Sequence, residues 1–493
     1  MIMRAKTTGR RKLTASPGHH AGGAVRVALI LGCVGQLVAC AHFQPKPLSA
    51  RSSMARFDAR SLHSPGLRAF LAANHVVAPA PRAVWGLKAL TLTAFYYQPA
   101  LAEARARLLA AQAMRVTAAE RPNPSIAVTP GYDAGVPGAI HPWVVPLTFD
   151  WTIETAGRRG DRLAEARHQA AAARWDLVGT LWRIRSRLRG ALLELYAARR
   201  SAALLEEEAR TRREVLRLLK GQLQAGNVSS YEVAQARIAL DRVLVARQAV
   251  VGRLRQSRIL LAGAIGVPLT ALTEVRFSFA DLRALPLALT RPAVRQEALL
   301  ERADVRAALE RYAASQSALQ LQIARQWPDI RLGPGFAWNA QLAGDHKWDL
   351  GLSLPLPILN QNQGPIAEAK ARRALAAAHF RLVQANAITQ IDGAVTAYDS
   401  ARAQLEATNS LLRGLRRALH SVVAEVKAGE LQPLDLANAR LAYQAGTQQR
   451  LAVFIKAQQA LGRLEYALQN PLTVARQPVR AVPNELSIAR ARP

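Results

Sequence analysis

The sequence repeats itself, and this duplication constrains the fold more than any other feature. The segment that starts at Pro124 returns at Pro328, an offset of 204 residues, and the glycine at Gly226 returns at Gly429, an offset of 203. A third match keeps the offset of 203 and joins residues 264–269 to 467–472. Repetition at a nearly fixed offset indicates repeated structure. We therefore expect two structurally equivalent halves.

Each half contains two segments in which apolar residues alternate with small or polar ones. A period of two is typical of strands. The apolar positions are Ile126, Val128, Pro130, Tyr132, Trp143, Val145, Leu147, Phe149, Trp151 and Ile153 in the first half, and Ile330, Leu332, Phe336, Trp338, Trp348, Leu350, Leu352 and Leu354 in the second. We predict four strands, each with one apolar face.

Long helices should flank these strands. No proline interrupts residues 157–224, where leucine and isoleucine recur at spacings of three and four, as they do along one face of a helix. Half of all residues are hydrophobic but only 5% are aromatic, which agrees with helices rich in Ala and Leu. Such a helix would extend roughly 100 Å. A matching helix should run from Gly364 to about Lys427, and each should return through an antiparallel partner.

The predicted strands have the length of membrane-spanning strands. About ten residues cross a bilayer as a tilted strand, and interfacial aromatic residues often flank such strands. Tryptophans lie in or beside the predicted hairpins, namely Trp143, Trp151, Trp327, Trp338 and Trp348. No run of 18 apolar residues follows residue 40, so strands would have to do the crossing. Four strands cannot close a barrel, so several copies should share one. The alternative is a soluble sheet that packs one face on a core.

The N-terminus has the pattern of an export signal. Six basic residues precede or flank a short apolar run within residues 1–39, which is typical of a cleaved secretory signal. The run ends in Leu37-Val38-Ala39-Cys40, which resembles a bacterial lipoprotein signal in which Cys40 carries the lipid. The alternative is an ordinary signal followed by an incidental cysteine. Because Cys33 lies inside the signal, the mature chain can form no internal disulfide.

Charge and motifs argue against several functions. The net charge of +32 comes from arginines spread at helical spacing along the whole chain, without the aromatic interleaving of a nucleic-acid-binding surface. The sequence lacks a phosphate-binding loop, a zinc-protease helix and a serine elbow, so we expect neither an enzyme nor a cofactor. His141 and His346, one in each predicted hairpin loop, could be imagined as metal ligands, but lone loop histidines are usually solvated.

From about Leu90 to Leu472 the sequence resembles the TolC outer-membrane factor family, on the duplication, the strand pairs, the long helices and the Ala-Gly turns. The resemblance implies a mainly helical protomer with a small β part. Its long antiparallel helices would form a periplasmic α-barrel, and its four strands would join a shared, trimeric, 12-stranded β-barrel. It also implies a homotrimer that works with a periplasmic adaptor and an inner-membrane pump.

Two segments between strand and helix resemble the branch of this family associated with heavy-metal cation efflux. They are Ile153 to Gly160 and Leu354 to Gly364, and they contain Gly157, Gly160, Pro355, Pro357 and Gly364. Glycine permits the unusual dihedral angles of a bend, and proline ends ladder pairing. The heavy positive charge departs from this branch, because a cation pathway lined with arginine would be odd unless the charge faces outward.

The turns between the long helices are the main candidate sites. The resemblance implies adaptor contact there, at Gly226, Asn227, Ser229, Ser230, Gly429, Glu430, Pro433 and Asp435. A glycine in such a turn is also needed simply to reverse the chain. Glu232 and Asp435 follow the turns at equivalent places, where they would either interact with a helix N-terminus or take part in charge-based gating.

We predict a signal peptide at 1–39, a lipidated linker at 40–88, repeats at 89–272 and 293–472, an inter-repeat linker at 273–292 and a tail at 473–493. The predicted function is passive export of solutes through the outer membrane, with heavy-metal cations as one candidate cargo. The protein would be lipid-anchored in the outer membrane and would extend into the periplasm. The alternative is a periplasmic coiled-coil structural or adaptor lipoprotein.

Overall fold

A computed structural model describes residues 42–77, 79, 84–132, 143–286, 292–339 and 345–472. The described residues divide into two units, one that ends at Phe57 and one that begins at Asp58. The first unit contains most of helix α2 (Ala50–Asp58), which has no buried residue, and all other elements below belong to the second unit. Cys40 and His141 lie outside the described residues. Within the described ranges, no helix combines the length and the apolar character that crossing a bilayer requires.

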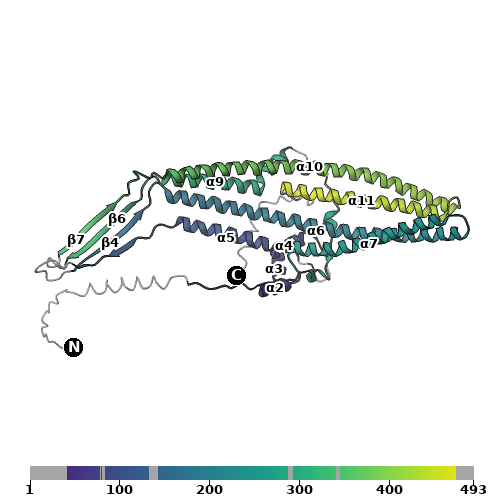
Figure 1. Ribbon diagram of the computed structural model, residues 1–493, viewed down its shortest axis with the longest axis horizontal. Helices are drawn as coiled ribbons and strands as arrows, with labels where there is room; N and C mark the ends of the chain where they lie inside the picture. The colour runs from purple at the N-terminus through teal and green to yellow at the C-terminus, as the bar shows by residue number, and fades with distance from the viewer. Residues whose placement is uncertain are drawn as a thin grey trace, which may run out of the picture. The chain divides into compact units, whose positions relative to one another are not determined.

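The second unit confirms the predicted duplication (Figure 1). The first half comprises α5 (Pro99–Ala119), β2 (Ser125–Val128), β3 (Gly131–Tyr132), β4 (Trp143–Ile153), α6 (Arg158–Gln224) and α7 (Ser230–Ile265). The second half comprises α9 (Ala303–Ala324), β6 (Ile330–Asn339), β7 (Asp345–Ser353), α10 (Gln363–Ala428) and α11 (Pro433–Leu468). Both halves therefore run helix, strands, long helix, turn and return helix.

The long helices have nearly equal lengths in the two halves. Helix α6 has 67 residues and α10 has 66, so each extends about 100 Å. Their return partners α7 and α11 have 36 residues each. The α6–α7 and α10–α11 turns lie together at the end opposite the sheet (Figure 1).

The main sheet joins the two halves through its central strands. Its order is β2-β4-β6-β7, every pair is antiparallel, and β3 adds to β4 beside β2. Apolar residues form rows across it, as in Val128–Leu147–Phe336–Trp348. The first strand was predicted as continuous from residue 126 to 132, but it breaks between β2 and β3. Pro130 lies in the break and has no N–H to donate to a ladder.

Beyond one end of the sheet, four helices continue the strands in the same order (Figure 1). Helix α5 leads into β2, β4 into α6, α9 into β6 and β7 into α10. The contacts run α5–α6, α6–α9 and α9–α10. Closer to the turns, α6 pairs with α7, α10 pairs with α11, and α11 packs on α6. The outermost of these four helices are thus α5 and α10, which continue from the outermost strands β2 and β7.

The stretches predicted as linkers hold structure of their own. Helix α3 (Pro65–Ala73) and strand β1 (Val84–Trp85) lie in the stretch 40–88, and β5 (Arg276–Phe277) lies in 273–292. Helices α4 (Leu87–Tyr97) and α8 (Pro292–Glu301) start at the ends of these stretches and lie mostly in the predicted repeats. Strands β1 and β5 pair in parallel. The description as linkers needs correction because these stretches bury apolar side chains in the core around α6, namely Leu62, Leu67, Leu71, Trp85, Phe277 and Leu282.

Candidate functional site

One face of the sheet is apolar and exposed. Trp348 is 78% exposed, Leu350 72% and Ile126 68%, although such side chains are normally buried. The opposite face carries small or polar residues, and Gly333 pairs with Gly351 there. On the same face a side chain at Gly335 would collide with the carboxylate of Asp349. Contiguous exposed apolar surfaces are typical of sites that contact lipid or another apolar partner.

The sheet has two open edges. Among the described residues, β7 has a ladder partner only in β6, and β2 and β3 have one only in β4. The helices that continue from these edge strands expose apolar side chains too: Leu109 and Val116 of α5 are 63% and 67% exposed, and Leu375 of α10 is 70% exposed. Unpaired edges are places where another chain can add. The open strand edges and the exposed apolar side chains of α5 and α10 therefore lie on the same two sides of the protomer.

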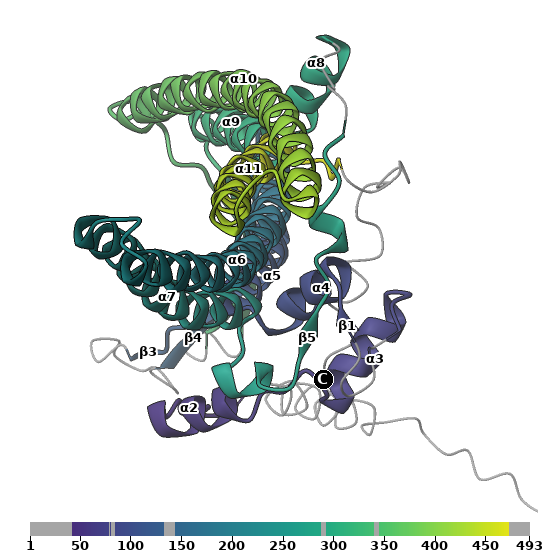
Figure 2. The same cartoon turned by 90° about the vertical axis from the view of Figure 1, so that its right-hand side faces the viewer.

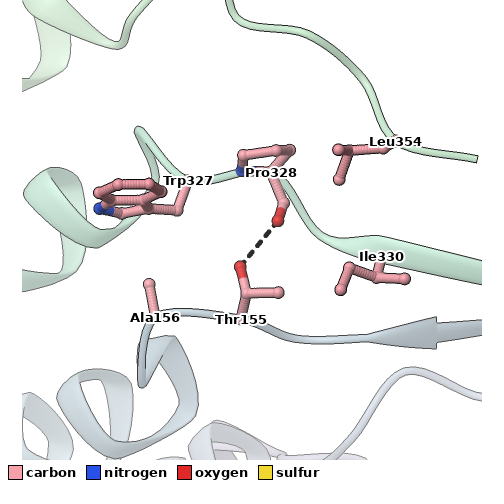
Figure 3. Close-up of a pocket in the computed structure, with 6 residues that line it drawn as sticks. All are labelled: Thr155, Ala156, Trp327, Pro328, Ile330 and Leu354. Atoms are coloured by element: carbon pink, nitrogen blue, oxygen red, sulfur yellow. Dashed lines mark hydrogen bonds between the residues drawn. The ribbon is translucent and has the colours of Figure 1, made fainter.

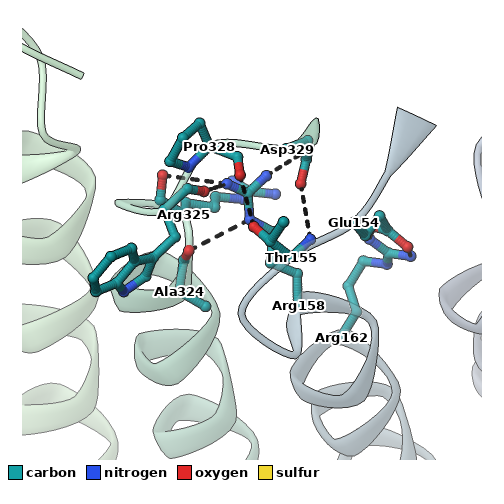
Figure 4. A network of polar contacts seen from close by, with 9 residues as sticks. Glu154, Thr155, Arg158, Arg162, Ala324, Arg325, Pro328 and Asp329 are labelled. Carbon is teal, nitrogen blue, oxygen red and sulfur yellow. Dashed lines mark hydrogen bonds and ion pairs between the residues drawn. The ribbon is translucent and has the colours of Figure 1, made fainter. Parts of the chain in front are cut away.

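An arginine at the first residue of α6 fastens the sheet to the helices (Figure 4). The guanidinium Nη1 of Arg158 lies 2.7 Å from Oδ2 of Asp329, and the same guanidinium donates to the carbonyl oxygens of Ala324 and Trp327 at the end of α9. The other oxygen of Asp329 accepts from the backbone N–H of Thr155 at 3.2 Å. Cations are favourable at a helix C-terminus, where carbonyl groups lack partners. Arg158 thus joins the first half to the second at this junction.

Two further arginines of α6 bind carbonyl groups at the C-terminal end of α5. Nε of Arg159 donates to the carbonyl oxygen of Ala119 at 2.7 Å, and Arg162 donates to the carbonyl oxygen of Glu120 at 3.0 Å while it pairs with Glu154. These interactions cap the last turn of α5. The arginines of this junction were not predicted as site residues, although the Arg158-Arg159 pair lies inside the predicted motif.

The predicted junction glycines have different roles. Gly157 precedes α6 with a φ of 73°, a left-handed conformation that glycine adopts readily. Gly160 and Gly364 have no positive φ, so the expectation of unusual dihedral angles is wrong for both. Before α10 the left-handed residue is Asn362, with a φ of 64°, because asparagine tolerates this region and its side chain donates to the carbonyl oxygen of Gln322 at 2.6 Å. Pro355 and Pro357 lie in the extended segment between β7 and α10.

A hollow of about 430 Å³ lies at this junction (Figure 3). It is lined by Thr155, Ala156, Trp327, Pro328, Ile330 and Leu354. The hydroxyl of Thr155 is already used, because it donates to the carbonyl oxygen of Pro328 at 2.7 Å. None of these six lining residues is titratable or a usual metal ligand.

Both turns between the long helices are built around capped helix ends. Gly226 has a φ of 76° and Gly429 of 84°, so the glycines reverse the chain as predicted. Ser229 and Glu232 form a reciprocal capping box at the start of α7, and Gln432 and Asp435 form one at the start of α11.

Both acids after the turns are therefore used in helix caps. The carboxylate of Glu232 accepts from the backbone N–H of Ser229 at 2.8 Å, and that of Asp435 from the backbone N–H of Gln432 at 3.0 Å. This agrees with the helix-terminus interpretation. The two turns also touch, because the amide of Gln222 donates to the side-chain oxygen of Gln432 at 3.1 Å. Ser230 and Pro433 are the first residues of α7 and α11.

A buried ionic cluster between α6 and α11 was not foreseen. Glu465 is fully buried and Arg189 is 2% exposed. Oε2 of Glu465 lies 3.0 Å from Nη1 of Arg185 and 3.4 Å from Nε of Arg189. Its other oxygen accepts from the backbone N–H of Leu472 at 2.9 Å. Burial alone would raise the pKa of Glu465, but the two arginines and these hydrogen bonds outweigh burial and lower it.

The same cluster holds the segment between the two repeats. Arg189 donates to the backbone carbonyl and the side-chain oxygen of Gln458, both at 2.7 Å. The amide of Gln458 donates to the carbonyl oxygen of Ala284 at 3.0 Å, and the hydroxyl of Tyr398 donates to that of Pro286 at 2.6 Å. Helices from both halves and the connecting segment are thus tied at one level.

Among the residues that the structure describes, no group of three or more His, Cys, Asp or Glu side chains is placed to hold a metal ion. His346 stacks on Phe336 with a centroid distance of 5.7 Å, and His141 lies outside the described residues.

Comparison with known proteins gives a consistent picture. The sequence matches the family described as outer membrane efflux protein over residues 94–267 and 294–470, which coincide with the two structural halves. It is 26% identical over 324 residues to the pyoverdine export outer membrane protein OpmQ of Pseudomonas aeruginosa, a match that covers 64% of each chain. The match therefore spans less than two thirds of that relative's length.

Two solved structures show the same fold. The outer-membrane channel OprN superposes with a TM-score of 0.64 at 18% identity, over 88% of this chain and 99% of that one. The outer membrane protein VceC of Vibrio cholerae gives a TM-score of 0.63 at 20% identity, over 78% and 96%. At these identities the likeness concerns the fold.

Proposed function

Because the chain belongs to the outer membrane efflux protein family, we propose that it is the outer-membrane duct of a tripartite efflux pump. It would let solutes pass from the periplasm to the exterior without performing chemistry. Energy and substrate choice would come from the inner-membrane pump, and a periplasmic adaptor would connect the two. The proposed location is the outer membrane, with the helices extending into the periplasm and Cys40 as the lipid attachment site.

The exposed apolar face of the sheet carries this proposal. Its rows of Trp and Leu side chains suit contact with lipid, and its opposite face of small, polar and charged residues suits a water-filled interior. The four-stranded path β2-β4-β6-β7 is too narrow to close on itself. Three copies would supply twelve strands and leave no open edge, which is the arrangement that we propose.

The helical layer supports the same assembly independently. If β7 of one copy pairs with β2 of the next, the helices that continue from these strands, α10 and α5, become neighbours as well. Each helix exposes two apolar side chains that are seven residues apart. They are Leu375 and Leu382 on α10 and Leu109 and Val116 on α5. One pairing event would thus cover the apolar borders of both layers. The result would be a helical tube continuous with the barrel.

The cargo is a separate proposal. The printed name of OpmQ assigns pyoverdine export to that protein, whereas the junction motifs of this chain resemble the heavy-metal branch. We propose a solute of the pyoverdine kind rather than a free metal ion, because the matching relative, at 26% identity, is a pyoverdine export protein.

Membrane fractionation separates the duct from the alternative, a periplasmic coiled-coil lipoprotein. We expect the Cys40→Ala protein to stay in the outer-membrane fraction and to require detergent for extraction, because its sheet would remain in lipid. The purified protein should also form ion-conducting pores in planar bilayers. Release of Cys40→Ala as a water-soluble protein without pore activity would favour the lipoprotein.

A further inference from the structure

Both halves carry an exposed row of basic side chains near the turns. Arg210, Arg213 and Arg217 of α6 lie 203 positions before Arg413, Arg416 and His420 of α10. Spacings of three and four residues place each set on one face of its helix. All six side chains are exposed. We call the two sets the basic stripes, and their recurrence in both repeats means that the assembled protein would carry them at one level.

The arginines of the basic stripes have no acidic partner in the described part of the chain. Three neighbouring acids pair with other arginines: Glu206 with Arg247 at 3.1 Å, Glu208 with Arg212 at 2.8 Å, and Glu214 with Arg440 at 3.3 Å. A fourth, Glu207, is exposed three residues before Arg210 and forms no ion pair with it. The stripes therefore keep their charge available for a partner. Uncompensated arginines that gather on one helix face raise the local positive potential.

The basic stripes lie on the helix faces that are covered higher up by the segments outside the repeats. On α6, the guanidinium of Arg199 lies over the rings of Phe277 and Phe279. Arg210 and Arg217 follow Arg199 by 11 and 18 residues, which are about three and five turns of helix. On α10, Tyr398 bonds to Pro286, and Arg416 follows it by 18 residues.

These covering segments indicate which way the stripes face. Elements α4, β1, β5 and α8 lie on one side of the long helices (Figure 2). In a tube made of several copies they would have to lie outside, since on the inside they would fill the passage. The basic stripes would therefore point outward, so their charge would not line a cargo pathway.

Building on the proposed function, we infer that the basic stripes form a docking surface for a carboxylate-bearing helical segment of the periplasmic adaptor. Arginine binds carboxylates with two parallel hydrogen bonds, and each stripe extends about 10 Å along its helix, which suits a partner helix laid alongside. Outer-membrane headgroups are unsuitable partners, because Arg213 lies 55 residues beyond the start of α6 and hence about 80 Å from the sheet.

The stripes also fit the flat surface of the inner membrane poorly. Such a surface would meet the turns themselves, and these turns carry the acids Glu232, Glu430 and Asp435. A helix alongside would instead meet the arginines and avoid the turn acids. Binding through exposed charges should weaken as salt rises.

Photo-crosslinking in cells tests this inference. With p-benzoylphenylalanine at Lys220, next to the α6 stripe, we expect an adduct to a periplasmic protein, mapped by mass spectrometry to a helical segment rich in Asp and Glu. Arg213→Glu/Arg217→Glu should lower the adduct yield at least tenfold, as should Arg413→Glu/Arg416→Glu. Changing acids of the mapped segment to Lys should restore it.

The matched control is Arg167→Glu/Arg174→Glu, which reverses two exposed arginines of the same helix near the sheet and should leave the yield unchanged. Adducts to lipid, adducts to a segment without acids, or a yield unaffected by charge reversal at the stripes would overturn the inference. Pore formation by the purified stripe variants should equal that of the original protein. If the unsubstituted protein itself formed no pores, that result would instead contradict the proposed function.

Discussion

Replacing Glu465 with alanine is expected to destabilise the protein by about 3–5 kcal/mol, the usual cost of removing one member of a buried ion pair. The change would leave Arg189, which is 2% exposed, without its carboxylate. It would also release the backbone N–H of Leu472, which Glu465 holds at 2.9 Å. Because the cluster ties α6 and α11 to the connecting segment, the loss of the carboxylate should destabilise both halves.

Thermal dissociation and unfolding of the purified protein in detergent, followed by circular dichroism, measure this effect. Glu207→Ala, which removes an exposed acid of α6, should change stability by no more than about 0.5 kcal/mol. Equal melting of Glu465→Ala and the unchanged protein would show that the carboxylate is not paired inside the fold.

The same residue predicts an acid dependence. The pKa of Glu465 is lowered from its ordinary value of 4.5, so its folded form releases the proton more readily than its unfolded form. Its contribution to stability is then complete above about pH 5 and is lost as the pH falls through the lowered folded pKa. Glu465→Gln should therefore lose stability at neutral pH and respond less to acid below pH 4.5.

Lysine at position 147 is expected to block insertion, whereas lysine at position 148 should be tolerated. Leu147 belongs to the exposed apolar face and Thr148 to the opposite face of the same strand, β4. Both side chains are exposed in the single chain, so in water the two substitutions would cost similar amounts. In lipid, a lysine on the outer face of a barrel costs about 2–4 kcal/mol near the bilayer centre.

The two variants form a matched pair for one measurement, the amount of protein assembled in the outer-membrane fraction. We expect a large loss for Leu147→Lys and little change for Thr148→Lys. Equal assembly of the two would mean that neither face of the sheet meets lipid.

Much of the fold could be predicted from the sequence because its signals are periodic. The nearly constant offset, seen for example between Gly226 and Gly429, predicted the duplication. Helical spacing within proline-free stretches predicted the ends of α6 and α10 to within a few residues. Alternation with a period of two gave the strands and their apolar faces. Local rules also explain the turns, where glycine and the capping residues act within a few positions of one another.

Features that depend on distant partners could not be predicted. Arg185 and Glu465 are 280 positions apart, and no local pattern shows that they meet. The same holds for Arg158, whose partners at the end of α9 lie in the other half. The pairing of β1 with β5 was not predicted, because each of these strands has only two residues. Two residues are too few for a periodic signal.

One error concerns which residue type takes the left-handed conformation before α10. Glycine was expected to take the left-handed position before α10, but Asn362 takes it. Both residue types tolerate that conformation, so the sequence alone leaves the choice open. The predicted adaptor contacts at the turns stay predictions, since they concern a second protein.

The most direct test of the shared barrel is disulfide formation between its two proposed edges. In a Cys40→Ala background, one cysteine replaces Leu350 in β7 and a second replaces, in turn, each residue of β2 from Ser125 to Val128. Oxidation of membranes should give covalent dimers and trimers, but no larger species, for at least one of these pairs. Single-cysteine chains should stay monomeric on denaturing gels. If every pair yields only uncrosslinked monomers, β7 and β2 do not meet between copies, and the account of a barrel built from several chains is contradicted.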